Sequence, residues 1–177
     1  MSSPGWLVLT WRLPAASSTA RVATWRSLRR LGAITLTPGA VIVPYSEHFL
    51  EQLEWIAEDV VQRGGDAYVL PVTELPEADE EQIRRRMSKE RREEYADLRQ
   101  AAEDLVGRLA KADPAVVEAI DRFHFGRELA ALQRRLAGAV GRDPFESTGR
   151  KDAQRAVDRA HSASLSMRAR GKHTRKS

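Results

Sequence analysis

The sequence predicts an α+β protein, in which a ferredoxin-like βαββαβ sheet is followed by a long α-helical hairpin and a basic tail. Residues 5–75 alternate short β-rich runs with helical periodicity in that order, and right-handed crossovers then give the strand order 4-1-3-2. Residues 76–140 keep the apolar spacing of helices packed side by side, and this helical hairpin is expected to pack on the sheet domain. Residues 141–177 are rich in Gly, Ser, Arg and Lys, which predicts a flexible tail.

The first strand is predicted at residues 6–13, whose sequence WLVLTWRL is rich in aromatic and branched side chains and lacks Gly. That composition predicts burial on both faces, and Pro14 ends the strand. The next helix is expected to end at Gly32, because glycine adopts the left-handed conformation after a helix without cost. Ser17 or Ser18 is expected to cap its first turn.

Two further strands are predicted at residues 33–37 and 40–44. Pro38 and Gly39 between them suit the two central positions of a type II turn.

A second helix is predicted over residues 46–65, with Ser46 as its N-cap. The fourth strand covers residues 66–74 and contains Pro71. Because proline has no backbone N–H to donate to a neighbour, this strand is expected at a sheet edge, as the predicted strand order requires.

Helices over residues 77–111 and 115–140 are expected to form an αα-hairpin, with a break at Ala112-Asp113-Pro114. The first has near-heptad apolar spacing, except at Arg91. In the predicted tail, part of the stretch from Arg150 to Arg170 has an alternative helical interpretation. One weak apolar face would then contain Ala153, Val157, Ala160 and Ser164.

The amino-acid composition excludes several kinds of site and shows where the positive charge lies. The chain has no cysteine, which excludes disulfides and thiolate metal sites and fits a cytoplasmic protein. The four histidines share no ligand spacing with carboxylates, so no metal or other cofactor is expected. The apolar runs are too short for a membrane span. Residues 1–145 hold 20 Lys and Arg against 22 Asp and Glu, whereas residues 146–177 hold 9 against 3, so the basic character lies in the tail.

Three stretches resemble one known family: WLVLTWRLP, RVATWRSLRRLGA and VIVP. They are similar to the N-terminal domain of the chromate resistance protein ChrB. The likeness continues more loosely through residues 46–75 and into the helix with Glu93-Glu94-Tyr95, and covers about residues 5–140. The resemblance implies a chromate-responsive regulator of a chromate efflux operon. In the full-length family a second domain follows, which this chain is expected to lack.

Arg12 and Arg21 are the candidate anion-binding residues. Arg21 falls in the stripe of Trp25 and Leu28 at a helix start, where free backbone N–H groups and the helix dipole favour anions. Arg12 lies at the end of the first strand. One interpretation is a site for chromate or a similar oxyanion. The alternative is a structural ion pair between Arg21 and Glu54 or Glu58.

Basic residues on the first helix and in the tail are candidate nucleic-acid contacts, because arginine and lysine neutralise phosphates. The alternative is a basic face that contacts only solvent. Trp11 and Trp25 are interpreted as core residues, not as stacking platforms. The candidate contacts are Arg26, Arg29, Arg30, Arg168, Arg170, Lys172, Arg175 and Lys176.

The leading hypothesis is therefore a non-enzymatic regulator or accessory protein of chromate resistance that binds DNA and responds to an oxyanion. The second sheet face is also expected to be apolar, so either the C-terminal helices or a second protomer covers it, and a homodimer is predicted. The second hypothesis is a protein-interaction module without DNA binding. A metal-dependent nuclease is the weakest hypothesis, because Arg12 stands where such a site would need an acidic ligand for Mg²⁺.

Overall fold

The computed structural model describes residues 5–15, 17–112 and 119–173, with backbone only at 119–122, 168 and 170–173. The chain divides into two compact units, Met1–Met87 and Ser88–Ser177. Helix α3 (Glu77–Lys111) begins in the first unit and ends in the second. None of the described helices combines the length and apolar character needed to cross a membrane.

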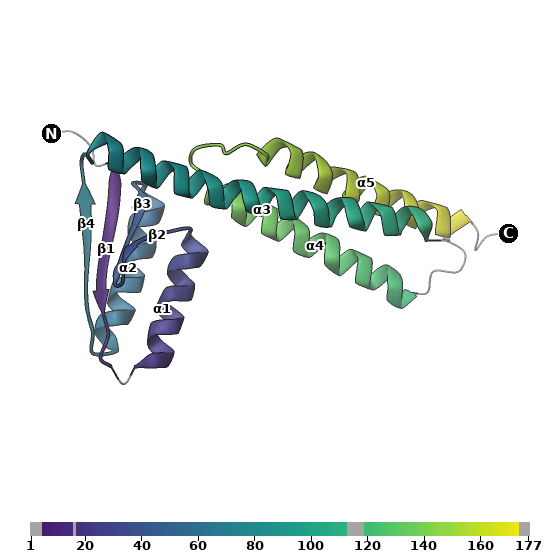
Figure 1. Ribbon diagram of the computed structural model, residues 1–177. Helices are drawn as coiled ribbons and strands as arrows, with labels where there is room; N and C mark the ends of the chain where they lie inside the picture. Colours follow the sequence, from purple (N-terminus) through teal and green to yellow (C-terminus); the bar gives the residue numbers. More distant parts are fainter. Residues whose placement is uncertain (1–4, 16, 113–118, 174–177) are drawn as a thin grey trace. The chain divides into compact units, whose positions relative to one another are not determined.

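A four-stranded antiparallel sheet forms the first unit (Figure 1). The spatial order is β2-β3-β1-β4, and each neighbouring pair is antiparallel. This is the predicted strand order. Pro71 lies on β4 at the edge, opposite Leu7 of β1, so its missing N–H interrupts no second neighbour. The strands are β1 (Trp6–Arg12), β2 (Ile34–Thr37), β3 (Ala40–Pro44) and β4 (Asp66–Val72).

Helices α1 (Ser18–Leu31) and α2 (Glu47–Gln62) cover one face of this sheet (Figure 1). Alternate residues of β1 and β3 point to these helices and bury an apolar core. The predicted cap of α2 is confirmed, because the Phe49 N–H donates to Ser46 Oγ at 3.1 Å. The core contains Leu7, Leu9, Leu28, Ala33, Val41, Val43, Phe49 and Leu53.

The opposite sheet face is buried in one part and exposed in another. Trp6, Ile34 and Ile42 are buried, and so are Ile83 and Met87 of α3. The Arg84 guanidinium lies 5.7 Å from the Trp6 ring centroid, and Arg86 donates to the Thr35 carbonyl at 2.9 Å. On β4 the side chains of Tyr68 and Leu70 are exposed. The dimer expected from this face stays a prediction, which sedimentation at micromolar concentration tests.

The second unit is a bundle of three helices, not a hairpin with a flexible tail. The later part of α3 packs with α4 (Ala119–Gly141) and α5 (Arg150–His173) around one apolar core (Figure 1). The expected flexible tail is therefore wrong over this helix, and the alternative helical interpretation is confirmed. The predicted N-cap Asp113 and the following Pro114 lie outside the described residues. The α5 residues in the core are Ala153, Ala156, Val157, Ala160 and Met167.

Small side chains explain why α5 packs so well despite its low hydrophobicity. Ala153, Ala156 and Ala160 are fully buried, and their spacing places them on one helix face. Short side chains allow two helix backbones to approach closely, so the contact area comes from the partner helices as much as from α5 itself. Leu98 and Leu105 of α3 and Leu132 of α4 belong to the same core.

An ion-pair network explains the arginine that interrupts the apolar pattern of α3. Arg91 is only 9% exposed, and its Nη1 donates to Glu94 Oε2 at 2.5 Å. The second oxygen of Glu94 accepts from Arg142 Nη2 at 2.7 Å. Because Arg91 is paired, its burial does not leave an uncompensated charge. Glu94 thus links α3 to the segment after α4.

A buried polar network holds the connection between α4 and α5. The Tyr95 hydroxyl donates to Asp143 Oδ2 at 3.0 Å, and the Ser147 hydroxyl donates to Asp143 Oδ1 at 2.7 Å. The Ser147 backbone N–H also donates to Asp143 Oδ2 at 2.9 Å. Burial and the hydrogen bond to Asp143 raise the pKa of Tyr95 above its ordinary value. The segment that leads into α5 is therefore anchored to α3 by side chains.

Candidate functional site

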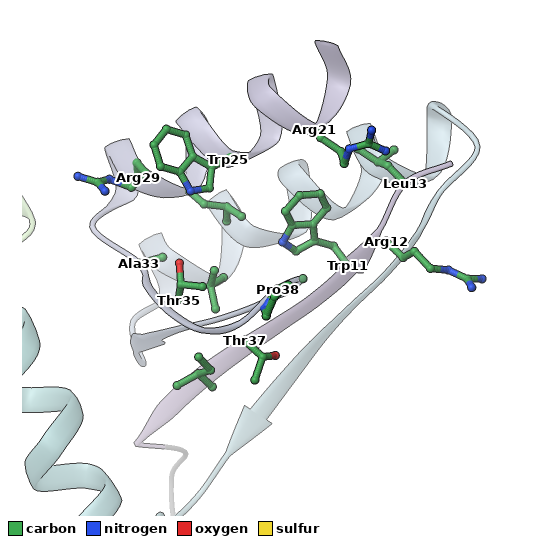
Figure 2. Close-up of a pocket in the computed structure, with 14 residues that line it drawn as sticks. Trp11, Arg12, Leu13, Arg21, Trp25, Arg29, Ala33, Thr35, Thr37 and Pro38 are labelled. Carbon is green, nitrogen blue, oxygen red and sulfur yellow. The ribbon is translucent and has the colours of Figure 1, made fainter. Parts of the chain in front are cut away.

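A groove of about 550 Å³ lies in the first unit, between α1, the end of β1 and the β2–β3 turn (Figure 2). Its walls are mostly apolar and include two tryptophans. Three arginines also line it, whereas no Asp, Glu, His or Lys does. The lining residues are Trp11, Arg12, Leu13, Arg21, Trp25, Leu28, Arg29, Ala33, Thr35, Leu36, Thr37, Pro38, Gly39 and Val41.

The β2–β3 turn forms one wall and is held against β1. The backbone N–H of Trp11 donates to the Gly39 carbonyl at 2.7 Å. Gly39 has φ +82°, the value that the second central residue of a type II turn needs. A Cβ on Gly39 would lie 2.5 Å from the Trp11 carbonyl oxygen, so only glycine fits. The predicted Pro38-Gly39 turn thus fixes the position of this wall.

Helix α1 forms the opposite wall, and it faces the sheet differently from the sequence prediction. Ala20, Thr24 and Leu28 are its buried residues. Trp25 is 48% exposed, so its interpretation as a core residue is wrong. Since successive helix positions turn by about 100°, Arg21 and Trp25 fall at the edge of the buried stripe, where the groove opens.

The start of α1 is held by Arg21, not by a capping hydroxyl. Ser17 occupies the N-cap position, but its side chain makes no capping hydrogen bond. Arg21 Nη1 and Nη2 donate to the carbonyls of Pro14 and Ala15, each at 2.8 Å. The planar guanidinium therefore ties the helix to the loop that leads into it.

Arg12 and Arg21 line the same groove but direct their charged groups to other partners. Arg12 pairs with Asp66 at 2.9 Å with 84% of its side chain exposed, and Figure 2 shows it pointing away from Trp11 and Trp25. Arg21 is engaged with backbone carbonyls, and it does not form the expected ion pair with Glu54 or Glu58. The two arginines thus form no preassembled oxyanion site, since anion binding would require them to change partners.

Arg21→Ala is expected to lower the free energy of unfolding by about 1–2 kcal/mol, because two exposed hydrogen bonds from a charged donor are lost. Arg21→Lys is expected to lie between this variant and wild type, because an ammonium lacks the planar fork that reaches both carbonyls. Urea denaturation followed by tryptophan fluorescence measures both. Arg26→Ala on the exposed side of the same helix is the control. An equal loss in Arg26→Ala would contradict a specific role of Arg21.

The outer side of α1 is strongly basic. The helix contains Arg21, Arg26, Arg29 and Arg30 and no acidic residue. Arg26, Arg29 and Arg30 are exposed. The Arg29 guanidinium lies 5.2 Å from the Trp25 ring centroid, and Arg30 donates to Ser27 Oγ at 3.0 Å. Helix α2, which packs beside α1, carries five acidic residues and no Lys or Arg. The two helices therefore have opposite charge.

The other candidate nucleic-acid contacts lie in the last ten residues of the sequence. The backbone of Arg168, Arg170 and Lys172 belongs to the last turns of α5, but their side chains are not described. Arg175 and Lys176 lie outside the described residues.

Among the described residues, the lining of the groove contains no carboxylate or imidazole, the groups that most often transfer protons. Within the described residues, no group of three or more His, Cys, Asp or Glu could hold a metal ion. Sequence reasoning missed Trp25 and Arg29 as members of the site. Their spacing of four residues is the signal that was available, since such positions are neighbours on a helix surface.

Comparison with known proteins identifies the family. The family model described as "Protein ChrB, N-terminal" matches residues 21–170, which include α3, α4 and α5 as far as residue 170. Protein ChrB of Cupriavidus metallidurans is 30% identical over 155 residues, which are 86% of this chain and 45% of that protein. The chain thus spans less than half the length of this relative. No solved structure matches. The match extends the resemblance seen in the sequence through α5, and the chain belongs to the ChrB family, as a form of its N-terminal domain.

Proposed function

We propose that this chain acts in chromate resistance as a regulatory or accessory protein that contacts DNA electrostatically. Membership of the ChrB family supports the role in chromate resistance. The observation that carries the DNA contact is the composition of α1, which has four arginines and no acidic residue. The strand order and the two helices on one sheet face support assignment of the first unit to the ferredoxin-like folds. In this proposal the chain is cytoplasmic, and it catalyses no reaction.

DNA binding is expected to weaken steeply with salt, because each phosphate that is neutralised contributes about 0.9 to the slope of log K against log [salt]. Two variants test the two basic regions. One replaces Arg26, Arg29 and Arg30 by Gln. The other replaces the five basic residues from Arg168 to Lys176 by Gln. Deletion of residues 146–177 is not a suitable test, since it removes the packed helix α5.

The control variant is Arg134→Gln with Arg135→Gln, which removes two exposed charges from α4. Fluorescence anisotropy with a labelled duplex, measured over a range of salt concentrations, gives each slope. We expect a smaller slope for both test variants and an unchanged slope for the control. Equal slopes in all four proteins would mean that neither region contacts phosphates.

A protein-interaction module without DNA binding is the second candidate, and two observations favour it. Helix α2, which packs beside α1, carries five acidic residues, and these would repel a DNA backbone that approached both helices. Trp55 of α2 is 59% exposed, which is unusual for an isolated surface residue and common in protein interfaces. Absence of DNA binding at low salt would favour this candidate.

Response to chromate or a similar oxyanion is a further part of the proposal. Arg12 and Arg21 would have to leave their present partners, so the expected affinity of these two residues for an oxyanion is low. Titration of chromate, with sulfate as the reference anion, while melting temperature is followed tests this part. An unchanged melting temperature at millimolar chromate would contradict an oxyanion site in this domain.

A further inference from the structure

We propose that the groove between α1, β1 and the β2–β3 turn binds a small planar aromatic anion. This inference does not depend on the proposed role in chromate resistance. The groove has a volume of about 550 Å³, within the range of about 300–1,000 Å³ that is usual for small-molecule sites. All its lining residues belong to the first unit, so the site is complete within one unit of one chain.

The aromatic part of the ligand is inferred from two tryptophans on different elements. Trp11 comes from the end of β1 and Trp25 from the middle of α1, and Figure 2 shows both indoles within the group of lining side chains. Trp25 is half exposed although the core of the first unit lies next to it. Indole faces favour flat aromatic partners, and Pro38, Leu28 and Val41 add apolar walls.

The negative charge is inferred from the balance of charges in the lining. Arg12, Arg21 and Arg29 are present, and no acidic residue is. The charge of Arg12 is offset by Asp66. Among the described residues, no carboxylate pairs with Arg21 or Arg29, whose guanidinium groups contact backbone carbonyls and the Trp25 ring respectively. Two uncompensated cations on an apolar groove favour an anion and disfavour a cation.

The need for an acceptor atom on the ligand is supported by Trp11. Its indole Nε1 is buried and has no hydrogen-bond partner. An unpaired buried donor is unfavourable, so a ligand oxygen that reached it would gain a hydrogen bond without displacing another acceptor. The Trp11 side chain is only partly buried, and it lines the groove.

Aromatic carboxylates and nucleoside monophosphates share this chemistry, so the test uses one of each, 2-naphthoate and AMP. The neutral control is 2-naphthalenemethanol, and the non-aromatic anion is cyclohexanecarboxylate. Chromate is included to separate this site from the oxyanion response proposed above. The tryptophan indole N–H signals of the ¹⁵N-labelled full chain report the position of binding, because Trp6 and Trp55 do not line the groove.

We expect 2-naphthoate, AMP or both to shift the signals of Trp11 and Trp25 in a saturable manner and to leave those of Trp6 and Trp55 unchanged. The two control compounds are expected to bind at least about tenfold more weakly than the aromatic anions. Chromate has no aromatic ring, so it is expected to shift the Trp11 and Trp25 signals only at concentrations at least about tenfold higher than the aromatic anions need. The proposal is wrong if neither aromatic anion saturates at millimolar concentration, if both controls bind equally well, or if Trp55 shifts in place of Trp25.

Two variants locate the contacts. Trp25→Leu removes the exposed ring but keeps an apolar residue, and it is expected to weaken binding about tenfold. Arg29→Gln is expected to weaken the binding of the anions and not that of the neutral compound. Arg29→Lys is expected to restore part of the affinity for the anions. Arg26→Gln is the matched control, because Arg26 is exposed on the same helix and does not line the groove. Equal affinity in Trp25→Leu and wild type would overturn the proposed site.

Discussion

Ala156→Glu is expected to unfold the helical bundle of the second unit. Ala156 is fully buried in the core that α5 shares with α3 and α4, and the described residues that form this core are all uncharged. An uncompensated buried charge costs about 3–5 kcal/mol, which is a large part of the stability of a typical domain. We expect loss of much of the helical signal in far-UV circular dichroism at room temperature.

The four tryptophans make this experiment selective for one unit. All of them lie before residue 88, so tryptophan fluorescence reports on the first unit, whereas circular dichroism is dominated by the long helices. Ser162→Glu is the matched control, because Ser162 is exposed on the same helix. If Ala156→Glu melts at the same temperature as Ser162→Glu, α5 is not packed in solution and the expected flexible tail is restored.

Asp143→Ala is expected to lower the free energy of unfolding by about 3 kcal/mol or more. Asp143 accepts hydrogen bonds from the Tyr95 hydroxyl, the Ser147 hydroxyl and the Ser147 N–H. Alanine would leave these three buried donors without an acceptor, and each unsatisfied group carries its own desolvation cost. Urea denaturation followed by circular dichroism measures the loss. Asp97→Ala is the control, since Asp97 is exposed on α3, and we expect a change within about 0.5 kcal/mol.

The same network predicts a pH dependence at alkaline pH. The folded state raises the pKa of Tyr95 above the value of about 10 in the unfolded chain, so it favours the neutral phenol. The contribution of Tyr95 to the free energy of unfolding is therefore complete below about pH 10. It is lost at up to about 1.4 kcal/mol per pH unit as the pH rises toward the pKa of the folded state. Tyr95→Phe removes the titrating group. If the stability of Tyr95→Phe falls as steeply as that of wild type, another group is responsible.

The order and edges of the sheet were predictable because they depend on local signals. Alternating apolar residues, a proline on the fourth strand and the Pro38-Gly39 turn each act over a few residues, and the observed strands and turn follow them. The cap at Ser46 and the left-handed Gly32, with φ 81°, are equally local. By contrast, Trp25 was misplaced, because Ala20, Thr24 and Leu28 define an equally regular stripe and a helix pattern does not say which one faces the sheet.

The sequence by itself determined the α+β class, the strand order and the resemblance to the ChrB family, since periodicity and short motifs carry that information. Only the tertiary structure decided the fate of the C-terminal residues, because a face made of alanines becomes apolar enough to pack only when α3 and α4 supply larger partners. It also decided the partners of Arg21 and Asp143. Neither the backbone carbonyls that bind Arg21 nor Tyr95, which lies 48 residues before Asp143 in the chain, leaves a periodic signal, so these hydrogen bonds follow from the three-dimensional arrangement of the chain.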